Sequence, residues 1–321
     1  MPPQPVSPQT WPLPASVAVR EVGPRDGLQN ERPIAPSERA RLAVALVAAG
    51  VRSIEAVSFV SERAVPAMAG AAEVLAAVAE ALDRAGTRRE VTLVALVPNL
   101  RGAEAAFATE VDELTVTISA SPAYNEKNVR MTVAESLGAI GAIAARADRR
   151  GVPVDAVVSC AFGSPFGEEI EPRSVAELAA ALKEAGCTAL TLADTTGAAS
   201  PRSLDEVLAA VEHGAGTPPQ AVGLHLHDTR GTALVNAWAA MERGVARFDT
   251  SVGGLGGSPF LPGAGGNLAS EDLVALLTDV GVATGVDLER LLTAATLAEE
   301  LVGHALPSRT MSALRVAPAP Y

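Results

Sequence analysis

Short apolar runs alternate with longer, alanine-rich stretches along almost the whole chain, and this alternation constrains the fold more than any other feature. Apolar runs of about four to eight residues are typical of buried parallel strands, whereas longer amphipathic stretches are typical of helices. The predicted strands are Val17–Val22, Ser53–Phe59, Val91–Val97, Glu113–Ser119, Val154–Ala161, Ala189–Ala193, Val222–His227 and Arg247–Val252.

The stretches between these runs are predicted to be helices. Ser37 is predicted as the N-cap of the first helix, and glycines that follow helix ends are predicted as C-caps. The helices are expected over Ser37–Ala49, Pro66–Ala85, Gly102–Thr109, Thr132–Arg150, Ser174–Ala185, Ser200–His213, Thr232–Arg243 and Ser270–Val280. The predicted glycine C-caps are Gly50, Gly151, Gly186 and Gly244.

About eight strand–helix units in succession, with no linker between them, predict an α/β fold of the (β/α)₈ TIM-barrel type. A doubly wound open sheet is the alternative. The barrel is favoured because the number of units matches and because polar residues cluster where the strands end. Three segments are expected: a Pro-rich arm over 1–16, a barrel domain over 17–306 that includes an extra C-terminal helix over 287–304, and a tail over 307–321.

Composition excludes several classes of protein. A net charge of −12 argues against nucleic-acid binding, which needs a basic surface. No apolar run approaches the ~18–20 residues of a membrane span, and the first residues lack the features of a secretory or organelle signal. Two cysteines without a CxxC pattern are too few for a disulfide scaffold. We therefore expect a cytoplasmic protein that binds neither nucleic acid nor membrane.

Two of the four histidines lie in the predicted strand 221–228, at His225 and His227. Residues two apart in a strand share a face, so both imidazoles are expected on one surface. Such a pair can be part of a divalent metal site, or both rings can be hydrogen-bonded structural histidines.

Polar residues follow several predicted strands, and a barrel gathers strand ends at one rim. Asp26 after the first strand can join the two histidines in binding Mg²⁺, Mn²⁺ or another divalent ion, and Asn267 can add an amide oxygen. Asp228, at the end of the histidine strand, is a further carboxylate beside this set.

Three charged residues are candidates for roles around such a metal. Arg25 can stabilise negative charge on a substrate oxygen, or it can form a salt bridge that holds Asp26 or Glu55. Glu55, like Glu21, is expected to pair with Arg25 or to orient a ligand. Asp194 can act as a general base or can support a histidine.

The glycine-rich stretch 253–267 suits a mobile lid over the barrel mouth. It lacks the Lys and Ser/Thr of a P-loop and the spacing of a dinucleotide fingerprint, so phosphate cradling is set aside.

Taken together, these stretches resemble the 3-hydroxy-3-methylglutaryl-CoA lyase family, metal-dependent barrel lyases related to isopropylmalate synthase. The resemblance extends from about Val17 to Glu300. The segments that carry it are 21–31, 54–55, 58–61, 97–100, 158–161, 225–229, 254–257, 266–269 and 271–273.

The resemblance implies retro-Claisen cleavage of an acyl-CoA substrate, with acetyl-CoA and acetoacetate as products, as in leucine degradation and ketone-body metabolism. It implies Mg²⁺ or Mn²⁺ as cofactor, and fold analogy favours a homodimer. The site residues it implies are Asp26, His225, His227 and Asn267 as metal ligands, Arg25, Glu55, Asp194 and Ser258 in catalysis, and Arg25, Gln29 and Ser58 in substrate binding.

Two positions depart from the family pattern. Ser258 stands where the family's glycine-rich loop has a cysteine, and an aliphatic hydroxyl is far less acidic than a thiol. Val157 replaces a tyrosine that tends to face the site. These changes leave open a lyase for another 3-hydroxyacyl-CoA or hydroxy acid. A synthase that condenses acetyl-CoA with a 2-oxo acid and a catalytically weak binding or assembly protein are the further alternatives.

Overall fold

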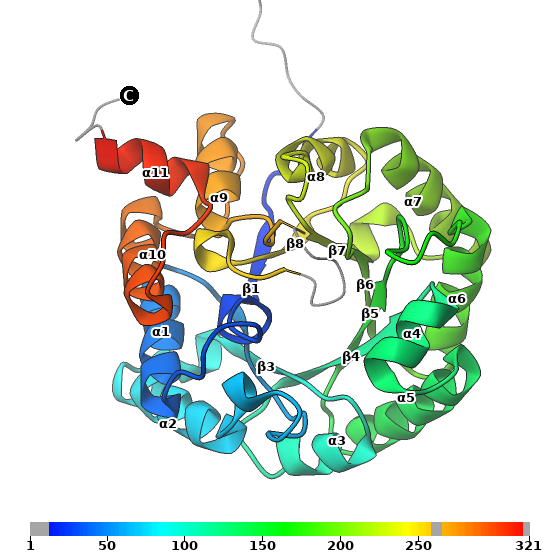
Figure 1. Cartoon of the computed structure of the whole chain (residues 1–321), viewed down its shortest axis with the longest axis horizontal. Coiled ribbons are helices and arrows are strands. Elements are labelled where there is room, and N and C mark those ends of the chain that lie inside the picture. Colours follow the sequence, from blue (N-terminus) through cyan, green and yellow to red (C-terminus); the bar gives the residue numbers. More distant parts are fainter. Residues whose placement is uncertain (1–12, 258–264, 317–321) are drawn as a thin grey trace, which may run out of the picture.

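A computed structural model describes residues 13–257 and 265–316, and its centre is a closed barrel of eight parallel strands in chain order (Figure 1). The first strand pairs with the eighth, which closes the barrel. The strands are β1 (Ala18–Glu21), β2 (Ser53–Ser58), β3 (Thr92–Leu96), β4 (Glu113–Ser119), β5 (Val154–Ser159), β6 (Ala189–Asp194), β7 (Val222–Leu226) and β8 (Arg247–Thr250). All eight predicted strands, and with them the (β/α)₈ barrel, are confirmed.

Helices surround the strands, and the helix over 288–302 lies beside the first one (Figure 1). The predicted additional helix over 287–304 is confirmed as α10. The helices are α1 (Pro36–Ala48), α2 (Ala71–Arg84), α3 (Leu100–Ala106), α4 (Pro122–Val129), α5 (Val133–Asp148), α6 (Pro172–Glu184), α7 (Pro201–Ala215), α8 (Ala233–Glu242), α9 (Ser270–Asp279), α10 (Leu288–Val302) and α11 (Arg309–Val316).

Most predicted helix starts differ from the observed ones by one or more residues, and two of these differences have a clear physical reason. The first helix begins at Pro36 with Ala35 as its N-cap, because proline fits the first helical turn, where no backbone N–H is needed. The segment after β2 forms a short 3₁₀ turn, Pro66–Met68, before α2. Gly70 separates the two with a φ of 74°, a conformation that a helix interior does not contain. The four glycines predicted as C-caps have positive φ, but each lies one or two residues beyond the C-cap, which is Ala49, Arg149, Ala185 or Arg243.

The ends of the chain add one element that the sequence patterns did not reveal. Helix α11 lies within the predicted tail, and its Met311 is buried in the core. Most of the predicted N-terminal arm lies outside the described residues, although Ser16 already pairs with Ala283. No helix in the described part of the chain is long and apolar enough to cross a membrane.

The barrel interior is polar, whereas branched apolar side chains usually fill it. Arg20, Asp155 and Asp249 are buried there and contact one another through the guanidinium of Arg20. Arg247 on β8 donates a 2.8 Å hydrogen bond to Asp155. Gly223 on β7 leaves room for Arg247, because a Cβ at this glycine would lie 2.6 Å from the Arg247 Cζ atom. Charged groups therefore extend from the barrel floor toward its mouth.

Candidate metal centre

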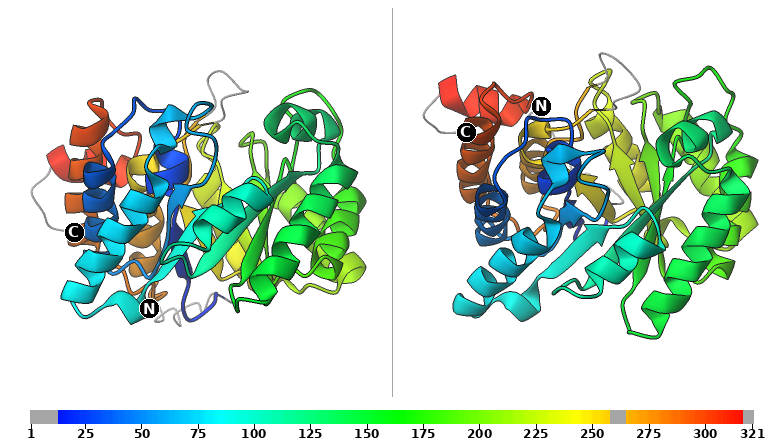
Figure 2. Two further views of the ribbon diagram at one scale, coloured as in Figure 1. Left: turned by 90° about the horizontal axis from the view of Figure 1, so that it is seen from below. Right: turned by 60° about the horizontal axis from the view of Figure 1, so that its bottom comes forward.

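The segment after β1 turns sharply into the barrel mouth. Residues Gly23–Gly27 form a π-helical turn, in which the Leu28 N–H donates to the Gly23 carbonyl and the Asp26 N–H donates to the Val22 carbonyl. Such wide turns are rare and often occur at functional sites. This turn and α4 lie at the same end of the barrel in the side view (Figure 2). The turn brings Arg25 and Asp26 to the carboxyl ends of the strands.

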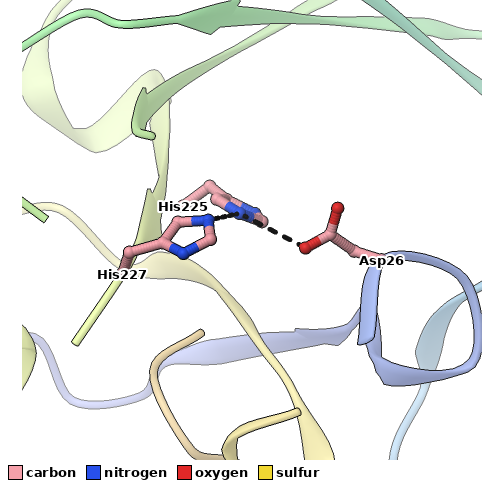
Figure 3. A group of neighbouring side chains, drawn as sticks. All are labelled: Asp26, His225 and His227. Atoms are coloured by element: carbon pink, nitrogen blue, oxygen red, sulfur yellow. Dashed lines mark hydrogen bonds and ion pairs between the residues drawn. The ribbon is translucent and has the colours of Figure 1, made fainter. Parts of the chain in front are cut away.

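His225 and His227 lie at the end of β7, and both point toward Asp26 on the opposite side (Figure 3). The two Nε2 atoms are 3.3 Å apart, and the His225 Nε2 atom is 3.9 Å from Asp26 Oδ2. One ligand atom from each residue lies within 4.8 Å of the others, and all three residues are buried. The predicted grouping of these residues is therefore present.

The fourth predicted ligand lies against the same group. Asn267 donates from Nδ2 to Asp26 Oδ2 at 2.8 Å and to the Leu255 carbonyl at 2.9 Å. Both of these partners are oxygen atoms that accept, so the Asn267 side-chain atom that contacts them is the amide nitrogen. The remaining oxygen, Asn267 Oδ1, is buried and has no hydrogen-bond partner among the described residues.

This donor set fits a divalent cation. A buried amide oxygen without a partner is costly unless something else pairs with it, and a cation can do so. Two nitrogen ligands at right angles on one ion lie roughly 3 Å apart at metal–ligand distances of about 2.1 Å, close to the observed spacing of the histidines. One carboxylate, two imidazoles and one amide oxygen suit ions such as Mg²⁺, Mn²⁺ or Zn²⁺.

The surroundings shift the pKa values of the two histidines in opposite directions. Burial lowers the pKa of His227 to about 4, so its ring is neutral near pH 7. Burial opposes a charge on His225 as well, but Asp249 and Asp26 raise its pKa. The carboxyl of Asp26 ionises readily, because Arg25 and His225 lower its pKa against the effect of burial.

Arg25 joins the metal group to β2. Its Nε atom donates to Glu55 Oε2 at 2.5 Å, and its Nη1 atom donates to Asp26 Oδ1 at 2.7 Å. The salt bridge that was predicted as the alternative role of Arg25, to Asp26 or to Glu55, is present to both carboxylates. Against the cost of burial, Glu55 and Asp26 raise the pKa of Arg25, which keeps its guanidinium charged.

Three other predicted carboxylates have different partners. Asp194 accepts hydrogen bonds from the Ala198 and Ala199 N–H groups, and burial raises its pKa to about 6. Asp228 caps α8 by accepting from the Ala233 N–H, so it is not part of the metal group.

Glu21 does not pair with Arg25 as expected. It accepts from the Gly23 and Val252 N–H groups and from the Ser270 hydroxyl. This difference arises because Glu21 follows inward-facing Arg20 and therefore points out of the barrel.

The residues predicted to contact substrate differ in their burial and in their hydrogen-bond partners. Ser58 Oγ is buried and has no hydrogen-bond partner among the described residues. Gln29 donates to Asp26 Oδ1 at 3.0 Å. Val157 is half-buried on β5. Ser258 lies outside the described residues.

The start of the glycine-rich stretch passes very close to the metal group. A Cβ on Gly256 would lie 2.4 Å from the Asn267 Nδ2 atom, and the φ of Gly256 is 120°. Asn30 donates to the Gly257 carbonyl at 2.9 Å. Glycine is needed at position 256 because the backbone passes directly over the side chain of Asn267.

Two residues of this site, Arg20 and Asp249, are absent from the sequence prediction. Asp249 accepts a 3.2 Å hydrogen bond from His225 Nδ1, and Arg20 donates to both of its carboxylate oxygens. The signal in the sequence is a charged residue inside an apolar strand, where burial demands a partner.

Comparison with known proteins gives consistent matches over nearly the whole chain. The family model described as HMGL-like matches residues 16–298. Hydroxymethylglutaryl-CoA lyase YngG of Bacillus subtilis is 40% identical over 95% of this chain and 99% of that protein. The 3-hydroxy-3-isohexenylglutaryl-CoA/hydroxy-methylglutaryl-CoA lyase of Pseudomonas aeruginosa is also 40% identical, over 94% of this chain and 98% of that protein.

Solved structures agree in fold. The crystal structure of hydroxymethylglutaryl-CoA lyase from Pseudomonas aeruginosa has a TM-score of 0.89 at 40% identity, covering 95% of this chain and 99% of that one. An HMG-CoA lyase from Acinetobacter baumannii, in complex with coenzyme A and 3-methylmalate, has a TM-score of 0.88 at 36% identity. That match covers 96% of this chain and 98% of the other.

Proposed function

The chain belongs to the HMGL-like family, and we propose that it is a divalent-metal-dependent lyase that cleaves 3-hydroxy-3-methylglutaryl-CoA to acetyl-CoA and acetoacetate. The observation that carries this proposal is the buried group of Asp26, His225 and His227 at the barrel mouth, in a chain 40% identical to curated lyases of that name. Arg25 stands directly beside this group.

We propose that Asp26, His225, His227 and Asn267 hold Mg²⁺ or Mn²⁺. Such an ion, when bound, polarises substrate oxygen atoms and orients the substrate. The partnerless Asn267 Oδ1 atom supports its inclusion as a ligand. The hydrogen bonds from Arg25 and Gln29 to Asp26 Oδ1 leave Oδ2 as the oxygen that faces the histidines.

In the proposed reaction a base removes the proton of the tertiary hydroxyl group. The bond between the hydroxyl-bearing carbon and the carbon next to the thioester then breaks, and its electron pair forms a thioester enolate. The hydroxyl-bearing carbon becomes the ketone of acetoacetate, and protonation of the enolate carbon gives acetyl-CoA.

Asp194 is the proposed base. Burial raises its pKa to about 6, which is close to the working pH that general-base catalysis favours.

Arg25 is proposed to stabilise the enolate oxygen. Its guanidinium is held by Glu55 and Asp26, so its position is fixed before charge develops. Preorganised positive charge of this kind commonly contributes a large part of the rate enhancement.

Ser58 and Gln29 are proposed to contact substrate polar groups, and the Ser58 hydroxyl, which has no hydrogen-bond partner among the described residues, supports this role. Ser258 is proposed to take part in delivering the proton to the enolate carbon.

The test is metal-dependent release of acetyl-CoA from 3-hydroxy-3-methylglutaryl-CoA by the native protein and by Ser258→Cys. We expect the native protein to release acetyl-CoA, and we expect removal of the metal by a chelator to abolish this activity. His227→Ala should remove this activity, whereas His213→Ala, at an exposed histidine on α7, should retain it.

The outcomes separate the substrate from the proton path. Turnover by Ser258→Cys alone would mean that the native chain binds this substrate but protonates the enolate poorly. No turnover by either protein, with metal bound, would reject this substrate and direct the search to other 3-hydroxyacyl thioesters.

A further inference from the structure

We propose that Asp249 is a positioning residue that holds His225 with its Nε2 atom facing the cation, and that Arg20 fixes the carboxylate of Asp249 for this purpose. The inference rests on the metal site of the proposed function. It concerns residues that lie deeper in the barrel than the four proposed ligands.

The strand register brings these three residues to one level of the barrel. Asp249 on β8 is directly paired with Arg20 on β1 and with His225 on β7. Residues paired at one level of neighbouring parallel strands point to the same face, here the interior. Barrel closure therefore places the carboxylate between the guanidinium and the imidazole.

The hydrogen bonds define the tautomer of His225. Asp249 Oδ2 lies 3.2 Å from His225 Nδ1. Both oxygens of Asp249 accept from the guanidinium of Arg20, so this carboxylate is an acceptor and the Nδ1 atom carries the proton that it donates. The lone pair of the neutral ring is then on Nε2, the atom that faces His227 and Asp26.

Arg20 pairs with the buried carboxylate of Asp249 through two hydrogen bonds. Arg20 donates from Nε to Oδ1 at 2.7 Å and from Nη2 to Oδ2 at 2.9 Å. This two-pronged contact fixes the plane of the carboxylate, which a single ammonium group could not do.

The second histidine is oriented in a different way. His227 Nδ1 lies 3.2 Å from the carbonyl oxygen of Gly265, at the end of the glycine-rich stretch. Carboxylates raise the basicity of a metal-binding histidine more than a carbonyl does, because they carry a full negative charge. His225 is thus anchored in the barrel wall, whereas His227 depends on a loop.

The test compares Asp249→Ala with Asp155→Ala. Asp155 is a matched control because it is fully buried and accepts a 2.6 Å hydrogen bond from the same Arg20, but its hydrogen-bond and ion-pair partners among the described residues include no histidine. Each variant leaves Arg20 with one of these two carboxylates. Mn²⁺ affinity is measured by electron paramagnetic resonance, without substrate, and unfolding is monitored in parallel.

We expect Asp249→Ala to lower Mn²⁺ affinity by roughly 10–100-fold, the range typical for loss of a residue that orients a metal-binding histidine. Asp155→Ala should stay within about threefold of the native value while losing stability. Asp249→Asn keeps an oxygen that can accept from Nδ1, so it should recover part of the lost affinity. Equal losses for the two alanine variants, or native affinity in Asp249→Ala, would overturn the proposal.

A second measurement decides the question if the variants fail to fold. The chain has four histidines, so their ¹⁵N resonances can be assigned in the native protein loaded with Mg²⁺. The His225 proton is expected on Nδ1, and a proton on Nε2 would overturn the proposal. Because neither measurement uses substrate, a wrong choice of substrate would leave both results intact.

Discussion

Two fully buried carboxyl groups, Glu21 and Glu271, hold the turn from which the glycine-rich stretch begins, and they make stability depend on pH. Glu271, in the first turn of α9, accepts hydrogen bonds from the Gly253 N–H. Burial raises its pKa from 4.5 to about 8, and the nearby Glu21 adds to the shift. Burial likewise raises the pKa of Glu21 to about 7.

The sign follows from proton binding. Between the unfolded value of 4.5 and the folded value of about 8, the folded protein holds a proton on Glu271 that the unfolded chain has released. Stability must therefore fall as pH rises through this window. One pKa unit corresponds to about 1.4 kcal/mol, so Glu271 alone should lower the free energy of unfolding by roughly 2 kcal/mol between about pH 6 and pH 8.

Glu271→Gln tests this magnitude, because glutamine has the shape of the protonated carboxyl group and does not titrate. The free energy of unfolding is measured by urea denaturation from pH 6 to pH 8. The free energy of unfolding of the variant, relative to that of the native protein, should rise by roughly 2 kcal/mol from pH 6 to pH 8. Glu184→Gln, at an exposed position on α6, should show a pH-independent difference. A constant difference for Glu271→Gln, or one that shrinks with pH, would refute the reasoning.

Two further predictions concern the metal group. Asn267→Ala should lower Mn²⁺ affinity by at least about tenfold, since it removes a proposed ligand and a hydrogen bond to Asp26. Asn236→Ala, at an equally buried asparagine on α8, should destabilise the fold but leave affinity unchanged in the same titration; a loss there would point to a global effect. Arg25→Lys keeps the positive charge but cannot hold Glu55 and Asp26 at the same time as the guanidinium does. The kcat for acetyl-CoA release should therefore fall by about 10²-fold or more. Native kcat in this variant would exclude the proposed role of Arg25.

Much of the fold was readable from the sequence because its signals are local. The length of an apolar run, the period of a helix and a glycine after a helix end each depend on a few neighbouring residues. The same holds for His225 and His227, whose shared face follows from the two-residue period of a strand. The convergence of Asp26 and Asn267 followed from the barrel as a whole, since all carboxyl ends of parallel strands meet at one rim.

The partners of individual charges depended on tertiary structure. Asp228 directly follows the histidine strand in sequence, yet its carboxylate accepts from the first turn of α8 and is not part of the metal group. Arg20 and Asp249 are 229 residues apart and become neighbours only because β1 and β8 close the barrel. The sequence alone determined the eight strands, most of the helices and which strand ends carry polar groups. Only the closure of the barrel and the register of its strands decided which charged side chains pair. A buried charge needs a partner, and here that partner comes from another strand of the barrel.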